Sequence, residues 1–195
     1  MSFTRNLCQN GRLIFQTTPD IAVLSNYSCR CASLTNTTAY KPMRWGTARM
    51  KTFEDFNSGD VIALRTYAVT ESEMIEFAKR YDPQTFHTDP VRALESPFGG
   101  LIASGWLTGA IFMRMQCDSY MSDSSCVGSP GVDEIRWLHP VRPGDTLHGT
   151  NEVLKATPSR SKPNRGAVYS KVEIFNQDET LVMTLLTRAI YLRRT

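Results

Sequence analysis

The sequence predicts an α+β fold in which an antiparallel sheet curls around one central apolar helix. Residues 101–115 are apolar or small on nearly every helical face, so a helix in this segment must be buried on most sides. Strand-like segments separated by short turns follow it, and short turns join antiparallel strands. Wrapping these strands around the helix is the simplest way to bury it. The strand-like segments are residues 131–138, 146–155, 166–175 and 181–192.

The residues before the central helix predict a strand and a first helix. The strand-like run covers residues 61–69. Thr70 and Glu73 form a capping-box signature, which predicts a helix that starts at Glu71. Asp82-Pro83 ends this helix, because the residue before a proline avoids the helical region.

A second, short helix is expected over residues 91–94. Asp89-Pro90 has the pattern of an N-cap followed by a proline at the first helical position. His87 is therefore expected in the loop between the two helices.

The composition is that of a globular protein with one core. The chain has 195 residues, of which 41% are hydrophobic and 21% are charged, and this length supports one domain. The longest nearly apolar run, residues 101–113, is too short for a bilayer-spanning helix, and Arg114 closes it. The five cysteines are an odd number and are spread thinly along the chain, so a disulfide framework is not expected. The single Cys-x-Cys has no second pair of ligands at metal-site spacing, so a structural zinc site is not expected either.

The net charge of +3 is unevenly distributed along the chain. Residues 1–50 carry six basic side chains and one acidic side chain, Asp20, and they are rich in Ser and Thr. Residues 51–195 carry 16 Lys or Arg against 18 Asp or Glu, so this part is not expected to bind nucleic acid. We expect residues 51–195 to form a single domain and residues 1–50 to lie outside it.

Three interpretations of residues 1–50 are open. A basic, Ser-rich and acid-poor composition is typical of an organellar transit peptide, which would place the mature protein in the mitochondrial matrix. A translated leader upstream of a start at Met50 would have the same composition and would leave a cytoplasmic protein. A flexible basic arm is compatible with either interpretation.

Asp82 and His87 are the first candidates for catalytic residues. They lie five residues apart in a tight segment between two helices, where one bound water can contact both. A carboxylate and an imidazole are a common pair for proton transfer near neutral pH. A structural interpretation also fits, since Asp before Pro often ends a helix and a lone loop histidine is usually a surface or hydrogen-bonded residue. The residues alone leave both interpretations open.

The start of the central helix is the second candidate site. Residues 99–105 lead into the apolar helix, and free backbone N–H groups at a helix start favour an anion. Gly105 would let a ligand carbonyl approach closely. In the alternative interpretation, Ser104 only caps the helix, while Gly105 and Gly109 provide space for close packing.

Two segments that carry these candidates resemble the MaoC-like dehydratases, also described as (R)-specific enoyl-CoA hydratases of hot-dog fold. Residues 77–89 are similar to the hydratase motif of that family, with Asp82 and His87 at the positions of its Asp and His. Residues 98–106 resemble the start of the family's central helix, where Gly105 matches a glycine whose N–H polarises the thioester carbonyl.

The resemblance extends over residues 52–193. Residues 128–145 are similar to a later strand and turn of the family, and Gln84-Thr85 replaces the Asn-Pro of the commonest motif. The remaining histidines, His139 and His148, match no catalytic position of the family and are interpreted as structural or surface residues.

The resemblance implies a hydro-lyase that adds water to an enoyl-CoA or removes it from a 3-hydroxyacyl-CoA. Asp82 would accept a proton from the attacking water, and His87 would orient that water and deliver a proton to C2. The Gly105 N–H would stabilise the thioester oxygen. No metal or redox cofactor is expected, because conjugation with the thioester already acidifies C2, and coenzyme A enters only as part of the thioester substrate. The resemblance also implies a homodimer with the acyl site near the subunit boundary.

Ser104, Arg160 and Lys162 are candidates for substrate binding. Ser104 stands where many family members carry His, and the two cations lie in the basic segment 159–165, where they could meet the phosphates of coenzyme A. A solvated hairpin tip is the favoured interpretation of this segment, and phosphate binding is the alternative. Two other functions are open: a hot-dog acyl-CoA thioesterase, and an acyl-thioester-binding module without catalysis.

We predict that deletion of residues 1–49 leaves the melting temperature and the activity of the protein nearly unchanged. This segment has no periodic apolar face with which to dock on the core. Thermal unfolding of the full chain and of the shortened chain provides the measurement. A melting temperature that falls by many degrees on deletion would show that the segment packs on the domain.

Overall fold

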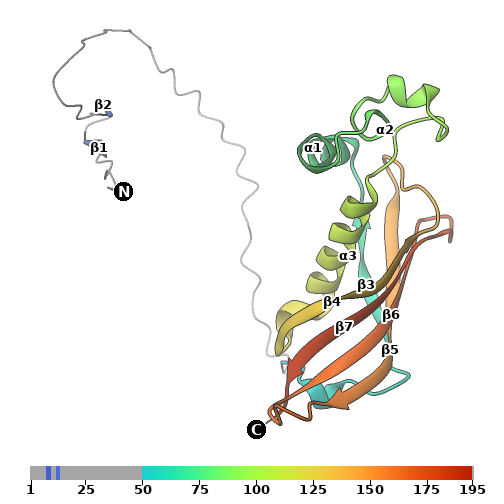
Figure 1. Ribbon diagram of the computed structural model, residues 1–195. Helices are drawn as coiled ribbons and strands as arrows, with labels where there is room; N and C mark the ends of the chain where they lie inside the picture. The colour runs from blue at the N-terminus through green and yellow to red at the C-terminus, as the bar shows by residue number, and fades with distance from the viewer. Residues whose placement is uncertain (1–7, 10–11, 14–49, 195) are drawn as a thin grey trace. The chain divides into compact units, whose positions relative to one another are not determined.

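The computed structural model describes residues 8–9, 12–13 and 50–194, and its main feature is a five-stranded antiparallel sheet. The strand order is β3-β5-β6-β7-β4, and the long helix α3, Gly105–Ser119, lies against one face of the sheet (Figure 1). This arrangement confirms the predicted α+β fold. The strands are β3 Val61–Ala68, β4 Cys126–Trp137, β5 Thr146–Pro158, β6 Arg165–Phe175 and β7 Leu181–Leu192.

Strand β4 is longer than predicted, because it begins at Cys126 rather than at Gly131. Its first half pairs with β7 through register shifts on either side of Gly128. Gly128 and Gly131 have φ angles of +133° and +148°, which a residue with a Cβ rarely adopts. These glycines let an irregular segment remain paired at the edge of the sheet.

The first helix, α1, Glu71–Tyr81, has the predicted bounds. The Thr70 side chain caps it by accepting a hydrogen bond from the Glu73 N–H, and Asp82 follows its last residue. The chain then forms a single helical turn, α2, Thr85–Thr88, so that His87 lies in a short helix and the prediction of a loop there was wrong.

The second predicted helix is the 3₁₀ helix η2, Arg92–Glu95. Its N-cap is Val91 rather than the predicted Asp89, but Oδ1 of Asp89 accepts hydrogen bonds from the N–H groups of Val91 and Arg92 just before the helix. Two other 3₁₀ turns flank the sheet, η1, Phe53–Asp55, and η3, Met121–Asp123.

Helix α3 begins at Gly105, four residues after the start of the apolar segment. Residues 101–104 are extended instead, because their backbone bonds to the neighbouring elements: the Ile102 N–H donates to the Phe86 carbonyl, and the Ala103 N–H donates to the Val141 carbonyl. Ser104 then caps α3 by accepting a hydrogen bond from the Trp106 N–H. This extended segment is thus bonded to α2 on one side and to the segment between β4 and β5 on the other.

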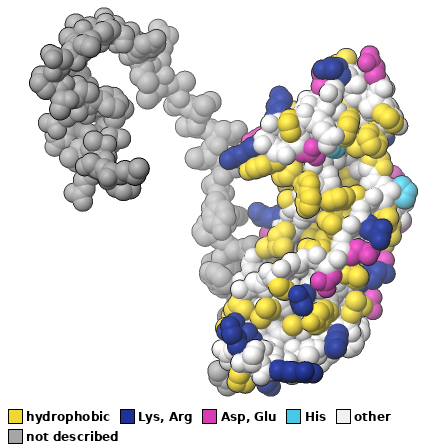
Figure 2. Space-filling model, in the orientation of Figure 1, with side chains coloured by type: hydrophobic (Ala, Val, Ile, Leu, Met, Phe, Trp, Pro, Cys, Tyr) yellow, Lys and Arg dark blue, Asp and Glu magenta, His cyan; other side chains and the backbone are white. Residues whose placement is uncertain are grey.

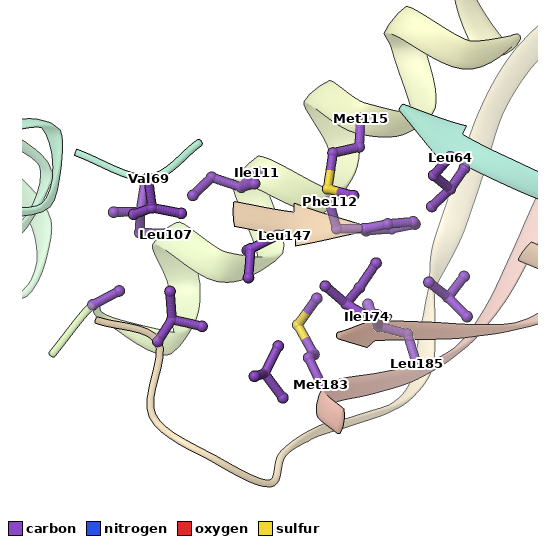
Figure 3. Close-up of a cluster of buried hydrophobic side chains, with 14 of the residues drawn as sticks. Leu64, Val69, Leu107, Ile111, Phe112, Met115, Leu147, Ile174, Met183 and Leu185 are labelled. Atoms are coloured by element: carbon purple, nitrogen blue, oxygen red, sulfur yellow. The ribbon is translucent and has the colours of Figure 1, made fainter. Parts of the chain in front are cut away.

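The core lies between α3 and the concave face of the sheet. Figure 3 shows one part of it, in which side chains from α3 meet side chains from β3, β5, β6 and β7. The sheet covers only one side of the helix, since Trp106 and Met113 on its other side are 64% and 48% exposed. The sequence predicts that this helix is buried on most sides, but in the structure it is buried only on the face toward the sheet. The labelled core residues are Leu64, Val69, Leu107, Ile111, Phe112, Met115, Leu147, Ile174, Met183 and Leu185.

Most of the segment assigned to a leader or arm, residues 1–50, lies outside the described residues. Within it, the structure describes the two-residue strands β1, Cys8–Gln9, and β2, Arg12–Leu13, which pair antiparallel with each other. None of the helices in the described part of the chain is long and apolar enough to cross a membrane.

We predict that Gly149→Ala destabilises the protein by about 1–3 kcal/mol, the usual cost of an extra methyl group in a packed core. A Cβ at this position in β5 would meet the backbone oxygen of Glu173 on the neighbouring strand and would lie 2.7 Å from Cδ1 of Ile174. Thr150→Ala, one residue further along the same strand, is the control. Urea unfolding of both variants is the measurement, and equal stability of Gly149→Ala and wild type would contradict this packing.

Candidate active site

Asp82 and His87 face each other at the junction between α1 and α2. Asp82 is the residue at which α1 ends, and the single turn of α2 starts three residues later at Thr85. This turn brings Nε2 of His87 to 3.4 Å from Oδ2 of Asp82. The two side chains that the motif contains are therefore close enough to share one water molecule.

The imidazole of His87 is held in one orientation by the backbone. Its side chain is buried, and Nδ1 lies 2.8 Å from the carbonyl oxygen of Ile102. A carbonyl oxygen can only accept a hydrogen bond, so Nδ1 carries a proton and donates a hydrogen bond to the Ile102 carbonyl. Nε2 is consequently the nitrogen that faces Asp82 and that is free to exchange a proton.

The carboxylate of Asp82 is held by two neutral donors. The Ser104 hydroxyl donates to Oδ2 over 2.7 Å, and the Gln84 side-chain amide donates to Oδ1 over 2.8 Å. Burial raises the pKa of Asp82, but these hydrogen bonds and the charge of protonated His87 together outweigh burial and lower the pKa below its ordinary value. Asp82 is therefore ionised at neutral pH and can accept a proton.

Gly105 lies at the N-terminus of α3, where backbone N–H groups lack helical partners. Among the described residues no acceptor binds its N–H group. Gly105 and His87 both border a pocket of about 320 Å³, and most of the wall of this pocket is apolar. The pocket is thus bordered both by an unpaired backbone donor and by the imidazole. Its lining residues are Phe86, His87, Phe98, Ile102, Ala103, Gly105, Thr108, Trp137, Leu138, His139, Pro140 and Val141.

Trp137 and His139 also border this pocket, and sequence reasoning missed both. Nδ1 of His139 lies 2.9 Å from the carbonyl oxygen of Leu181, which leaves Nε2 as the unpaired nitrogen. Both residues lie at or just beyond the end of β4, where the chain leaves the sheet beside the start of α3. Their place in the sequence carries no local signal, because only the wrapping of the sheet brings them to the pocket.

Ser104 is close to the site but does not border the pocket. It is 1% exposed, and its hydroxyl both caps α3 and donates to Asp82. The structure thus places Ser104 behind the carboxylate, where it positions Asp82, and gives it no contact with the pocket assigned to substrate.

Arg160 and Lys162 lie away from the pocket. They belong to the exposed hairpin between β5 and β6, whose Asn164 carbonyl accepts a hydrogen bond from the Arg193 N–H. The adjacent Leu192 N–H donates to the Ser125 carbonyl, close beyond the C-terminal end of α3, whereas the pocket lies at its N-terminal end. A helix of 15 residues is about 22 Å long, so the described chain does not bring these cations to the pocket.

Within the described residues, no group of three or more His, Cys, Asp or Glu side chains is placed to hold a metal ion. The chemistry that these residues can perform is proton transfer between an ionised carboxylate and an imidazole, beside a backbone donor suited to an oxygen that gains negative charge.

Comparison with known proteins identifies first the fold and then the family. The structure matches a MaoC-like dehydratase from Rhodospirillum rubrum with a TM-score of 0.68 and 37% identity, over 74% of this chain and 98% of that one. It also matches the R-hydratase PhaJ1 from Pseudomonas aeruginosa with a TM-score of 0.59 and 23% identity, over 73% of this chain and 86% of that one, a likeness of fold alone. The fold is the hot-dog fold, as the sequence predicts.

The chain belongs to the MaoC-like domain family, whose model matches residues 56–174. The protein YdeM of Bacillus subtilis (strain 168) is 28% identical over 129 residues, which is 66% of this chain and 90% of YdeM. The 3-hydroxyacyl-thioester dehydratase Z of Mycobacterium tuberculosis is 29% identical over 108 residues, which is 54% of this chain and 72% of that protein. The predicted family is therefore confirmed.

We predict that Ser104→Ala raises the pKa of Asp82, because the variant loses a hydrogen bond to the ionised carboxylate. The same variant loses the N-cap of α3, and this loss destabilises the protein by about 1 kcal/mol. Titration of the Asp82 carboxyl carbon by NMR measures the pKa, and denaturant unfolding measures the stability.

Thr70→Ala is the matched control for this prediction. It removes the N-cap of α1 at a similar expected loss of stability, but Thr70 makes no contact with Asp82. An Asp82 pKa that is the same in wild type and Ser104→Ala would contradict the role of the Ser104 hydroxyl.

Proposed function

We propose that the protein is a hydro-lyase that adds water to a 2-enoyl-CoA thioester or removes it from the corresponding 3-hydroxyacyl-CoA. The observation that carries the proposal is the approach of His87 Nε2 to 3.4 Å from Asp82 Oδ2, beside a pocket that Gly105 also borders. Relatives named as dehydratases support a reaction of this type.

In the proposed reaction, one water molecule is held between Asp82 and protonated His87. As the water oxygen bonds to C3, its proton passes to the Asp82 carboxylate, and the electron pair of the double bond moves toward the thioester oxygen. His87 then gives its Nε2 proton to C2. Transfer of the proton from Asp82 to His87 restores both groups, so that the net change is the addition of one water molecule.

The Gly105 N–H is proposed to bind the thioester oxygen during this step. It is the first helical N–H group of α3, and a donor that is already oriented stabilises developing negative charge without further reorganisation. The bond from His87 Nδ1 to the Ile102 carbonyl persists in both protonation states of the imidazole, so the ring keeps its orientation throughout.

An acyl thioester fits the character of the pocket. Most lining side chains are aliphatic or aromatic, and Phe86 and Phe98 pack with ring centroids 5.2 Å apart at one side. Such a wall suits an acyl chain, and a relative is named for action on a 3-hydroxyacyl thioester. We accordingly assign the acyl group of the substrate to this pocket.

The active form is proposed to be a homodimer that pairs at β4. This strand is an edge of the sheet, and an unpaired edge is a template for a second strand. Val132 on β4 and Trp106 and Met113 on α3 are exposed, and Figure 2 shows hydrophobic side chains gathered on the face over α3. A second copy of the chain would cover this face and would bring its own edge strand to the boundary of the pocket.

We predict that Asp82→Asn and His87→Gln each lower the turnover of a 2-enoyl-CoA by about 10²–10⁴-fold with little change in melting temperature. Asp82→Asn keeps the shape of the side chain but removes the base, and His87→Gln keeps a hydrogen-bond donor but removes titration. The double variant is expected to be hardly slower than either single variant, because two groups that share one water act as a unit. The measurement is the loss of enoyl absorbance, made with short, branched and dicarboxylic enoyl-CoA thioesters.

Asp89→Asn and His148→Gln are the matched controls for this experiment, because both residues lie outside the pocket lining and Asn caps a helix as well as Asp. If the folded Asp82→Asn and His87→Gln variants still turn over the enoyl-CoA, these two residues do not carry out the proposed proton transfers. Release of free thiol would identify a thioesterase instead, because hydration leaves the thioester bond intact whereas a thioesterase breaks it. Thermal stabilisation by the thioesters without any turnover would identify a binding module.

A further inference from the structure

The indole of Trp137 lies directly against the backbone of Gly105. A Cβ built on Gly105 would be 2.6 Å from Cε2, 2.7 Å from Cδ2 and 2.9 Å from Nε1 of Trp137. Real Cβ atoms do not approach other atoms this closely, so the ring occupies the space that any other residue at position 105 would need. Gly105 and Trp137 both border the pocket, so this contact forms part of its wall.

The ring also stands on the side of Gly105 from which a ligand oxygen must arrive. In an α-helix each Cα–Cβ bond tilts toward the N-terminus, which is the direction in which the N–H groups of the first turn point. A side chain that fills the Cβ position of Gly105 therefore lies beside its free N–H group. An acyl thioester whose oxygen accepts from that N–H brings its carbonyl carbon, C1, and the atoms bonded to C1 close to the indole.

The backbone keeps Trp137 in this place. It is the last residue of β4 and pairs with Met183 of the core, and the following Leu138 N–H donates to the Val182 carbonyl. The indole also packs edge-to-face on Trp106 with ring centroids 5.3 Å apart. The wall beside Gly105 is thus held by the sheet on one side and by the first turn of α3 on the other.

From this geometry we propose that Trp137 determines which acyl groups the site accepts, by excluding substituents at C2 of the thioester. This inference rests on the proposed function, which places the thioester oxygen at Gly105. The substrate class that follows is acyl thioesters with an unbranched C2, and the same ring makes glycine necessary at position 105.

The first test compares the hydration of 2-butenoyl-CoA with that of 2-methyl-2-butenoyl-CoA. We expect wild type to prefer the unbranched substrate by about 10–200-fold in kcat/KM, the range that one methylene group produces in an apolar pocket. Trp137→Leu should reduce this preference by about tenfold, and Trp137→Phe by less. Phe98→Leu is the control, since it removes a ring from another side of the same pocket and should leave the preference unchanged.

A double-mutant cycle tests the contact itself. Gly105→Ala should abolish hydration of 2-butenoyl-CoA in the wild-type background, because the methyl group meets the indole. In the Trp137→Leu background the same substitution should cost much less, so that the two effects are strongly non-additive. Additive effects, or a C2 preference that Trp137→Leu and Trp137→Phe both leave unchanged, would overturn the proposal.

A binding measurement separates this proposal from the proposed reaction. Butanoyl-CoA and 2-methylpropanoyl-CoA cannot be hydrated, so their stabilisation of the fold reports binding alone. We expect the unbranched thioester to raise the melting temperature of wild type more than the branched one, and we expect this difference to vanish in Trp137→Leu. If the difference is found but no enoyl-CoA is hydrated, the reaction is wrong and the role of Trp137 stands. Equal stabilisation of wild type by both thioesters would overturn the role of Trp137.

Discussion

The hydroxyl group of Ser104 joins the two halves of the candidate site. It accepts a hydrogen bond from the Trp106 N–H and so fixes where α3 starts, and it donates to Asp82 and so fixes the carboxylate. The position of Gly105 depends on the first bond, and the distance between Asp82 and His87 depends on the second. A single buried side chain therefore sets the geometry between a backbone donor on one helix and a proton-exchanging pair at the end of another.

The fold was predictable wherever local pattern and tertiary packing favour the same structure. Helix α1 has the predicted bounds because Thr70 and Asp82 provide a cap and a stop in the sequence itself. The apolar segment begins at Leu101, but α3 begins only at Gly105, because the N–H groups of Ile102 and Ala103 donate hydrogen bonds to the carbonyls of Phe86 in α2 and of Val141. Contacts between distant segments decided that boundary, and hydrophobic periodicity contains no information about them.

The same distinction applies to the site. The spacing of Asp82 and His87 within one motif pointed to their proximity, since six consecutive residues suffice to form it. Trp137 and His139 come from a distant strand and reach the pocket only because β4 pairs with β7 and ends beside α3. Arg160 shows the converse case, because a cationic segment predicts affinity for phosphate but says nothing of which end of the helix it lies near.

The low pKa of Asp82 constrains how the proposed reaction is shared between the two halves of the site. Burial acts against the ionised form, but the hydrogen bonds from Ser104 and Gln84 and the charge of His87 favour it more strongly. A carboxylate of low pKa is fully available but is a weak base, so it accepts a proton only as the water oxygen bonds to carbon. The attack must then be promoted from the other side, where the Gly105 N–H draws electrons toward the thioester oxygen and leaves C3 electron-poor. In the proposed reaction the two halves therefore act together on one substrate, and the Ser104 hydroxyl, which bonds to Asp82 and to the start of α3, holds them in one arrangement.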